Sequence, residues 1–196
     1  HDDYEGAVLV DHGVDIEPQV AKAFERALAG LRGVPDQVTL EDSNSRIRFA
    51  GFIGVSKAMA DDLGGVAKSE HLAKLLTYGP KRSIADWAED QAIIVRTAKR
   101  VHTILDEHGF LIMPTVPNPP FPHSDPEPAA QADFTCLANI AGCPALSMPM
   151  GYTEDGLPLG VQIVGSPGHE AGLFALARYL DNNLRAYRAP EPARGA

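Results

Sequence analysis

Long hydrophobic runs and basic side chains are both scarce in this sequence. No stretch approaches the roughly 18 consecutive apolar residues of a membrane-spanning helix, so we expect no membrane partner. Lysine and arginine total 17 against 26 aspartate and glutamate residues, which gives a formal charge of −9. This balance argues against a nucleic-acid partner, because such proteins use a basic face to displace counterions.

Cysteine is also rare. The two cysteines, Cys136 and Cys143, are too few for a disulfide framework. Free thiols are typical of a reducing compartment, and we therefore expect a cytoplasmic protein. The chain starts at His1 and not at methionine, which favours a trimmed N-terminus or a piece of a longer protein.

Motifs for metal and cofactor binding are incomplete. The segment His169–Leu173 begins like a zinc-binding helix, but Leu173 stands where a second histidine is needed. The pair Gly64–Gly65 is followed by Val66, so neither a phosphate loop nor a dinucleotide-binding fingerprint is present. The sequence predicts no metal and no cofactor.

Candidate nucleophiles lack the surroundings that would activate them. Ser147 has no flanking glycines, which favours a small residue packed in a sheet over a nucleophile elbow. Cys143 follows a helix C-terminus, where the helix dipole disfavours a thiolate. Lys74 and Lys81 are interpreted as solvated lysines. We therefore predict no catalytic residue in this chain, and keep an independent hydrolase using Ser147 or Cys143 as a distant alternative.

The first half of the chain alternates strand and helix patterns, which is typical of an α/β fold. Residues 6–10 form a short apolar run that predicts a buried strand. A helix is predicted from Pro18 onward, and its apolar face carries Val20, Phe24, Leu28 and Leu31. Residues 46–78 favour helix with a break at Gly64–Gly65, and within them Arg46 and Arg48 are either solvated or paired to bind a carboxylate.

A long helix is predicted between Ser83 and Gly109. Ser83 and Asp86 have the spacing of a capping box, and Gly109 provides the stop. The spacing predicts one buried stripe, made of Ile84, Trp87, Gln91, Ile94, Ala98, Val101 and Leu105. A coiled coil is the less favoured alternative, because the register lasts only about three heptads.

The second half contains a predicted strand, a proline-rich loop, a short helix and a hairpin. Residues 110–114 form the strand, and residues 114–130 form an extended surface loop because of their many prolines. A helix over residues 133–141 is followed by strands over residues 144–150 and 159–165, with Asp155–Gly156 at the turn. A final helix precedes a frayed tail over residues 189–196, and residues 1–196 are interpreted as a single partial domain.

The segment "FTCLANIAGCPALSMPMGYTEDGLPLGVQIVG", residues 134–165, resembles the C-terminal half of the amidase signature family. "GFLIMPTVPNPPFP" and "VDIEPQVAKAFERALAGL" resemble the segments that precede it there. The likeness covers most of the chain and is weak over residues 46–78. It implies the C-terminal part of an amidase-signature α/β fold, with a mixed β-sheet flanked by helices.

Members of this family hydrolyse amide bonds with a Ser–cis-Ser–Lys triad and a Gly/Ser-rich loop, all in the N-terminal half. This sequence holds no such loop, so the resemblance implies a triad on a missing N-terminal half or on a partner chain. This chain is then the part that forms the pocket for a small amide substrate. The resemblance implies substrate-binding roles for Phe52 and Phe134, and the alternative for each is an ordinary aromatic residue of the core. If the helix that carries Phe134 forms a pocket wall, we expect Phe134 to be partly open to a cavity and Leu137 and Ile140 to lie in the core.

The alternative is a non-catalytic, truncated or subunit-like module that binds a small molecule or a partner protein, including a second copy of itself in a homodimer.

Overall fold

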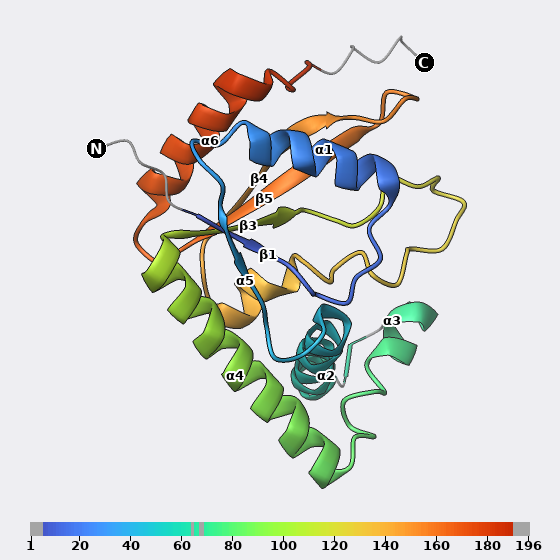
Figure 1. The fold of residues 1–196 in the computed structure, drawn as a ribbon. Helices are drawn as coiled ribbons and strands as arrows, with labels where there is room; N and C mark the ends of the chain where they lie inside the picture. Colours follow the sequence, from blue (N-terminus) through green and yellow to red (C-terminus); the bar gives the residue numbers. More distant parts are fainter. Residues whose placement is uncertain (1–5, 64, 67–68, 190–196) are drawn as a thin grey trace.

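A computed structural model describes residues 6–63, 65–66 and 69–189 as eleven helices and strands around one sheet (Figure 1). In chain order these are β1 (Ala7–Leu9), α1 (Pro18–Ala29), β2 (Asp36–Val38), α2 (Asn44–Asp62), α3 (Glu70–Leu75), α4 (Ile84–His108), β3 (Phe110–Pro114), α5 (Cys136–Ala141), β4 (Ala145–Tyr152), β5 (Pro158–Gly165) and α6 (Glu170–Leu184). None of the helices in the described part of the chain is long and apolar enough to cross a membrane.

The five strands form a single mixed sheet in the order β2-β1-β3-β5-β4. Strand β1 lies parallel to both β2 and β3, whereas β5 runs antiparallel to β3 and to β4. The pairing of β4 with β5 contains a register shift between Pro149 and Gly151. The predicted α/β class with a mixed sheet is therefore confirmed.

Helices cover both faces of the sheet, and each face has its own hydrophobic core (Figure 1). Helices α2, α4 and α5 pack on one face, while α1 and α6 pack on the other. Strand β3 shows why both faces are apolar: Leu111 and Met113 belong to the first core and Ile112 to the second. Strands buried on both faces read as continuous apolar runs, and this made β3 and β5 legible in the sequence.

The N-terminus of α4 agrees with the sequence prediction, and its buried face agrees in part. The Ser83 hydroxyl accepts a hydrogen bond from the Asp86 backbone N–H at 3.1 Å, which confirms the cap. Of the predicted stripe, Ile84 is 91% exposed, Val101 and Leu105 are buried, and the members between them are partly buried: Trp87, Gln91, Ile94 and Ala98. The buried face also contains Asp90, Ile93, Thr97 and Ile104. The prediction missed Asp90 and Thr97 because a search for apolar residues at helical spacing passes over polar side chains.

The hairpin and the helix before it follow the sequence prediction closely. Strands β4 and β5 pair across the turn that contains Gly156, and Gly142 ends α5 with a φ of 64° in the left-handed region. Helix α5 begins at Cys136, later than expected, because residues 130–135 form turns. Strand β2 was missed, since Asp36–Val38 contains a single apolar residue and gives no period.

Candidate functional site

A cavity of about 430 Å³ lies between α2, the turn after α3 and the start of α4. Its walls combine aromatic, apolar and charged side chains: Phe49, Ile53, Lys74, Thr77, Tyr78, Lys81, Arg82, Ser83 and Asp86. Concave sites with an apolar wall and a few polar groups are the usual form of small-molecule sites. This cavity is therefore the candidate site on the α2–α4 face.

Phe52 belongs to the aromatic group beside this cavity. Its ring lies 6.4 Å from the ring centroid of Phe49 and 5.8 Å from that of Tyr78, and the contact with Tyr78 is edge-on. Phe52 is half-buried and is not itself one of the lining residues. Phe49 and Tyr78 both line the cavity, so Phe52 packs behind two of its lining side chains.

The charged part of the wall is organised by one buried carboxylate, Asp90 of α4. Its side chain is fully buried and accepts hydrogen bonds from Arg82 at 2.7 and 3.1 Å and from Arg46 at 2.7 Å. The hydrogen bonds from Arg82, and then the one from Arg46, hold the pKa of the Asp90 carboxyl below its usual range. Asp90 thus remains charged and joins α2 to the segment before α4.

Both arginines also approach the Phe49 ring. The Cζ atom of Arg82 lies 5.2 Å from the ring centroid, and that of Arg46 lies 5.9 Å away. Their side chains remain 22% and 33% exposed. Two guanidinium groups held by a single carboxylate leave N–H donors for a polar group of a ligand.

A second buried carboxylate, Asp133, fastens the other side of α2. It accepts a hydrogen bond from the Ser45 hydroxyl at 2.6 Å and pairs with the Arg48 guanidinium. Arg46 and Arg48 thus pair with two different carboxylates of the protein. They neither bind one carboxylate together nor remain unpaired in solvent, so both interpretations from the sequence are wrong. Residues two apart on a helix face different directions, and each arginine found its own buried partner.

Phe134 is fully buried, so the expected opening of its side chain to a cavity is wrong for this chain. The neighbouring Asp133 side chain is bound to α2 through Ser45. The Phe134 ring points inward, and its centroid lies 4.9 Å from that of the His12 ring. Burial lowers the pKa of His12, so a neutral ring packs there. Leu137 is buried as expected, whereas Ile140 is only partly buried. The substrate-binding roles of Phe52 and Phe134 remain predictions.

In the described part of the chain Ser147 has no activating base beside it, whereas Cys143 has a histidine at the limit of hydrogen-bond distance. The Ser147 hydroxyl lies 2.6 Å from the Thr115 hydroxyl, which is not a base. The sulfur of Cys143 lies 4.0 Å from Nδ1 of His102, but burial raises the pKa of this thiol and keeps it protonated. Burial raises the pKa of Cys136 to about 12. Neither thiol is poised for attack.

Asp90 and Asp133 are the residues that sequence reasoning missed. A signal existed for Asp90, because it precedes Ile93, Thr97 and Val101 at helical spacing on the buried face of α4. A charged residue on such a stripe is almost never fully buried unless it is paired. No group of three or more metal-ligating side chains gathers among the residues that the structure describes.

Comparison with known sequences places these features in a family context. A family model described as Amidase matches residues 5–174. The A subunit of the glutamyl-tRNA(Gln) amidotransferase of Thermodesulfovibrio yellowstonii is 45% identical over 95 residues, which cover 42% of this chain and 20% of that protein. The corresponding protein of Methanosarcina barkeri is 36% identical over 148 residues, which cover 71% of this chain and 30% of that protein.

Solved structures share the fold. The crystal structure of the glutamyl-tRNA(Gln) amidotransferase A subunit from Thermotoga maritima matches with a TM-score of 0.72 and 20% identity, over 94% of this chain and 46% of that one. A bacterial aryl acylamidase matches with a TM-score of 0.69 and 17% identity, over 91% and 43% of the two chains. The chain thus spans less than a third of these two curated relatives and less than half of these two structures.

Proposed function

This chain belongs to the amidase family, and we propose that it forms the C-terminal, pocket-bearing part of an enzyme that hydrolyses amide bonds. In this proposal residues 1–196 are a single partial domain. The substrate is a small amide, and its acyl portion lies against the α2–α4 face.

The observation that carries the proposal is the pairing of an aromatic wall with anchored cations. Phe49 and Tyr78 offer apolar surface to an acyl group, and Arg82 offers donors to a polar group on the same molecule. Asp90 holds Arg82 in place before any ligand arrives, so little conformational entropy is lost on binding. Such positioning lowers the barrier of a reaction whose nucleophile comes from elsewhere.

The nucleophile and its base are proposed to lie on an N-terminal half or on a partner chain that carries the Ser–cis-Ser–Lys triad. An apolar stripe on the solvent side of α4 supports such a partner. Ile84 is 91% and Val95 is 68% exposed, and the exposed Ala88 and Ala92 lie between them at helical spacing. Exposed contiguous apolar surface of this kind marks an interaction site.

A subunit-like role is the second candidate, and the relatives favour it. Those from Thermodesulfovibrio and Methanosarcina are both named as one subunit of an amidotransferase. In this version the chain works only within an assembly, and a second copy of itself is one form that the assembly takes. Two free cysteines are compatible with a location in the cytoplasm, which we propose for either version.

The first experiment identifies the partner. The protein is isolated from its native source, and intact-mass and peptide mass spectrometry establish whether a Gly/Ser-rich segment with the triad lies on the same chain or on a co-purifying one. The isolated protein is then assayed on a series of amides that differ in acyl size. A preparation without a triad-bearing segment that still hydrolysed amides would refute the proposed division of labour.

The second experiment tests the pocket wall in the active protein. Phe52→Ala is expected to change the ratio of kcat/KM between small and large acyl groups by about tenfold or more, because pocket contacts discriminate by this order. Phe174→Ala on α6 is the matched control, since this ring is 62% exposed and lies away from the cavity. Equal profiles for the two variants would remove Phe52 from the site.

A further inference from the structure

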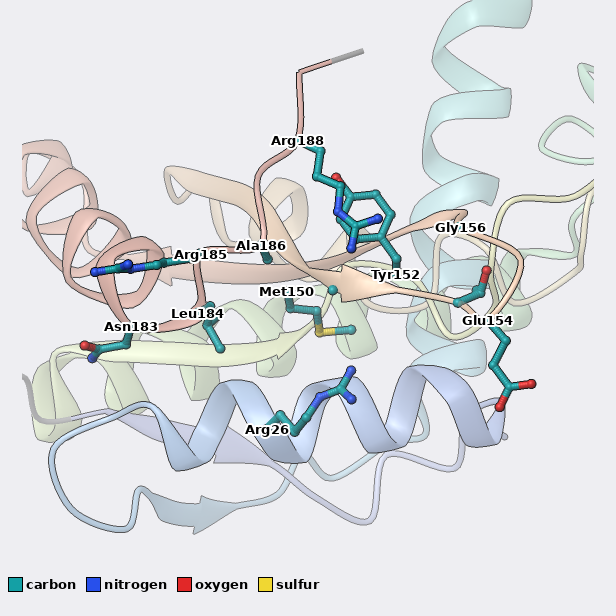
Figure 2. A pocket seen from close by; sticks show the side chains of 12 residues that line it. Arg26, Met150, Tyr152, Glu154, Gly156, Asn183, Leu184, Arg185, Ala186 and Arg188 are labelled. Atoms are coloured by element: carbon teal, nitrogen blue, oxygen red, sulfur yellow. The ribbon is translucent and has the colours of Figure 1, made fainter. Parts of the chain in front are cut away.

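A second cavity, of about 540 Å³, lies on the other side of the sheet from α2 and α4. It is bounded by α1, by the end of the β4–β5 hairpin and by the segment that follows α6 (Figure 2). Neither the aromatic group nor the buried aspartates of the first site take part in it. The two cavities are therefore separate sites.

Arginine side chains dominate the charge of this second cavity. Arg26 extends from α1 toward Met150, while Arg188 comes from the opposite side and covers Tyr152 (Figure 2). The Cζ atom of Arg188 lies 4.2 Å from the centroid of the Tyr152 ring. Arg185 also lines the cavity, although its side chain extends toward the end of α6, and Glu154 is the one carboxylate among the described residues of the lining.

The pairing of these arginines differs from that on the α2–α4 face. Arg46, Arg48 and Arg82 each bind a buried aspartate. Within residues 6–63, 65–66 and 69–189, by contrast, no carboxylate lies within ion-pair distance of Arg26, Arg185 or Arg188. In a protein with a net charge of −9, three arginines without carboxylate partners in this part of the chain form a local site of positive potential around one cavity.

The backbone at Gly151 shapes the cavity around Arg26. This glycine lies at the register shift between β4 and β5, where the strand departs from regular pairing. A Cβ atom at Gly151 would stand 3.2 Å from a guanidinium nitrogen of Arg26. The missing side chain therefore leaves room for the Arg26 head to lie against the strand with its other donors free.

We propose that this cavity binds a small organic anion that carries carboxylate or phosphate groups. A guanidinium keeps its charge at physiological pH and presents paired N–H donors that match the oxygens of either group. Arg26 and Arg188 bind the anion from α1 and from the C-terminal segment, so the ligand joins these two parts of the chain to the hairpin. Asn183 supports this arrangement, because its amide donates a hydrogen bond of 2.9 Å to the Gly30 carbonyl beyond the end of α1.

Calorimetric titration of the 196-residue protein tests the proposal, with inorganic phosphate and succinate as separate probes at constant ionic strength set with chloride. At least one probe is expected to bind, and the stronger of the two identifies the group that the site prefers. Arg26→Gln and Arg188→Gln are each expected to weaken that binding by about tenfold, because a hydrogen bond to a charged group is worth this order of affinity.

Arg178→Gln is the control, because it removes one positive charge from an exposed position of α6 outside the cavity lining. It should leave the affinity unchanged, and circular dichroism confirms that all three variants are folded. The proposal is overturned if neither probe binds at millimolar concentration. It is also overturned if Arg178→Gln weakens binding as much as the two cavity variants, since the effect is then general charge screening.

Discussion

Replacing Asp90 with asparagine tests whether the buried carboxylate of α4 organises the α2–α4 face. The variant keeps the side-chain volume but leaves Arg46 and Arg82 without their common anionic partner. Breaking a buried ion pair costs about 3–5 kcal/mol, and we expect the lower end because both arginines are partly exposed to water. The free energy of unfolding at neutral pH should therefore fall by about 3 kcal/mol.

The pH dependence of this loss separates charge from packing. The folded-state pKa of Asp90 is lowered, so its contribution is present above the unfolded pKa of about 3.9 and disappears as the pH falls through the folded value. The free energy of unfolding is measured with urea for the natural protein and for Asp90→Asn, at neutral pH and below pH 4. The two proteins should differ at neutral pH, and the difference should shrink as the pH falls. Other carboxylates titrate in the same pH range, but they contribute equally to the stability of both proteins and therefore do not affect the difference between them.

Asp106→Asn provides the matched control on the same helix, because Asp106 is exposed on α4. This change should alter stability by no more than about 0.5 kcal/mol. The reasoning fails if Asp90→Asn is no more destabilising than Asp106→Asn. It also fails if the loss caused by Asp90→Asn is the same at neutral and acid pH, since a packing defect would not titrate.

Three further outcomes are expected. In urea unfolding, Phe134→Ala should destabilise the protein by about 3–5 kcal/mol and Leu137→Ala by about 2–5 kcal/mol, because both side chains are fully buried. A much smaller loss for Phe134→Ala would indicate that Phe134 lies in a pocket wall and not in the core. Cys136 should react slowly with iodoacetamide in the folded protein at pH 8, because its pKa is raised to about 12, and quickly once the protein is unfolded; fast labelling of the folded protein would contradict its burial. The chain alone should not hydrolyse aryl amides, and turnover that vanished in Ser147→Ala or Cys143→Ala would refute this expectation.

Local patterns predicted most of the helices and strands. The cap at Ser83, the end of the short helix at Ala141 and the hairpin around Gly156 all appear in the structure where the sequence placed them. These features depend on neighbours within a few residues, so the chain itself carries the information. The apolar β3 strand was legible for a related reason, since burial on both faces leaves no polar position.

The candidate site was predicted much less well. Phe52 was predicted from the resemblance, and its role in substrate binding stays a prediction; its ring contacts Phe49 and Tyr78, which line the cavity. Phe134 was placed at the surface of a cavity, yet its neighbour Asp133 is drawn to α2 and turns it into the core. No count of apolar spacing contains this contact, because Ser45 and Asp133 lie 88 residues apart in the chain.

The sequence by itself determined the family, the lack of a complete catalytic motif, and most of the helices and strands, with β2 as the exception. Only the tertiary structure decided which charges are paired, which polar side chains of α4 are buried and which arginines surround a cavity. Arg46 and Arg48 show the physical reason. The cost of burying a carboxylate is offset only when a cation from another segment meets it, so the roles of Asp90 and Asp133 existed only after α2 had packed against α4 and α5.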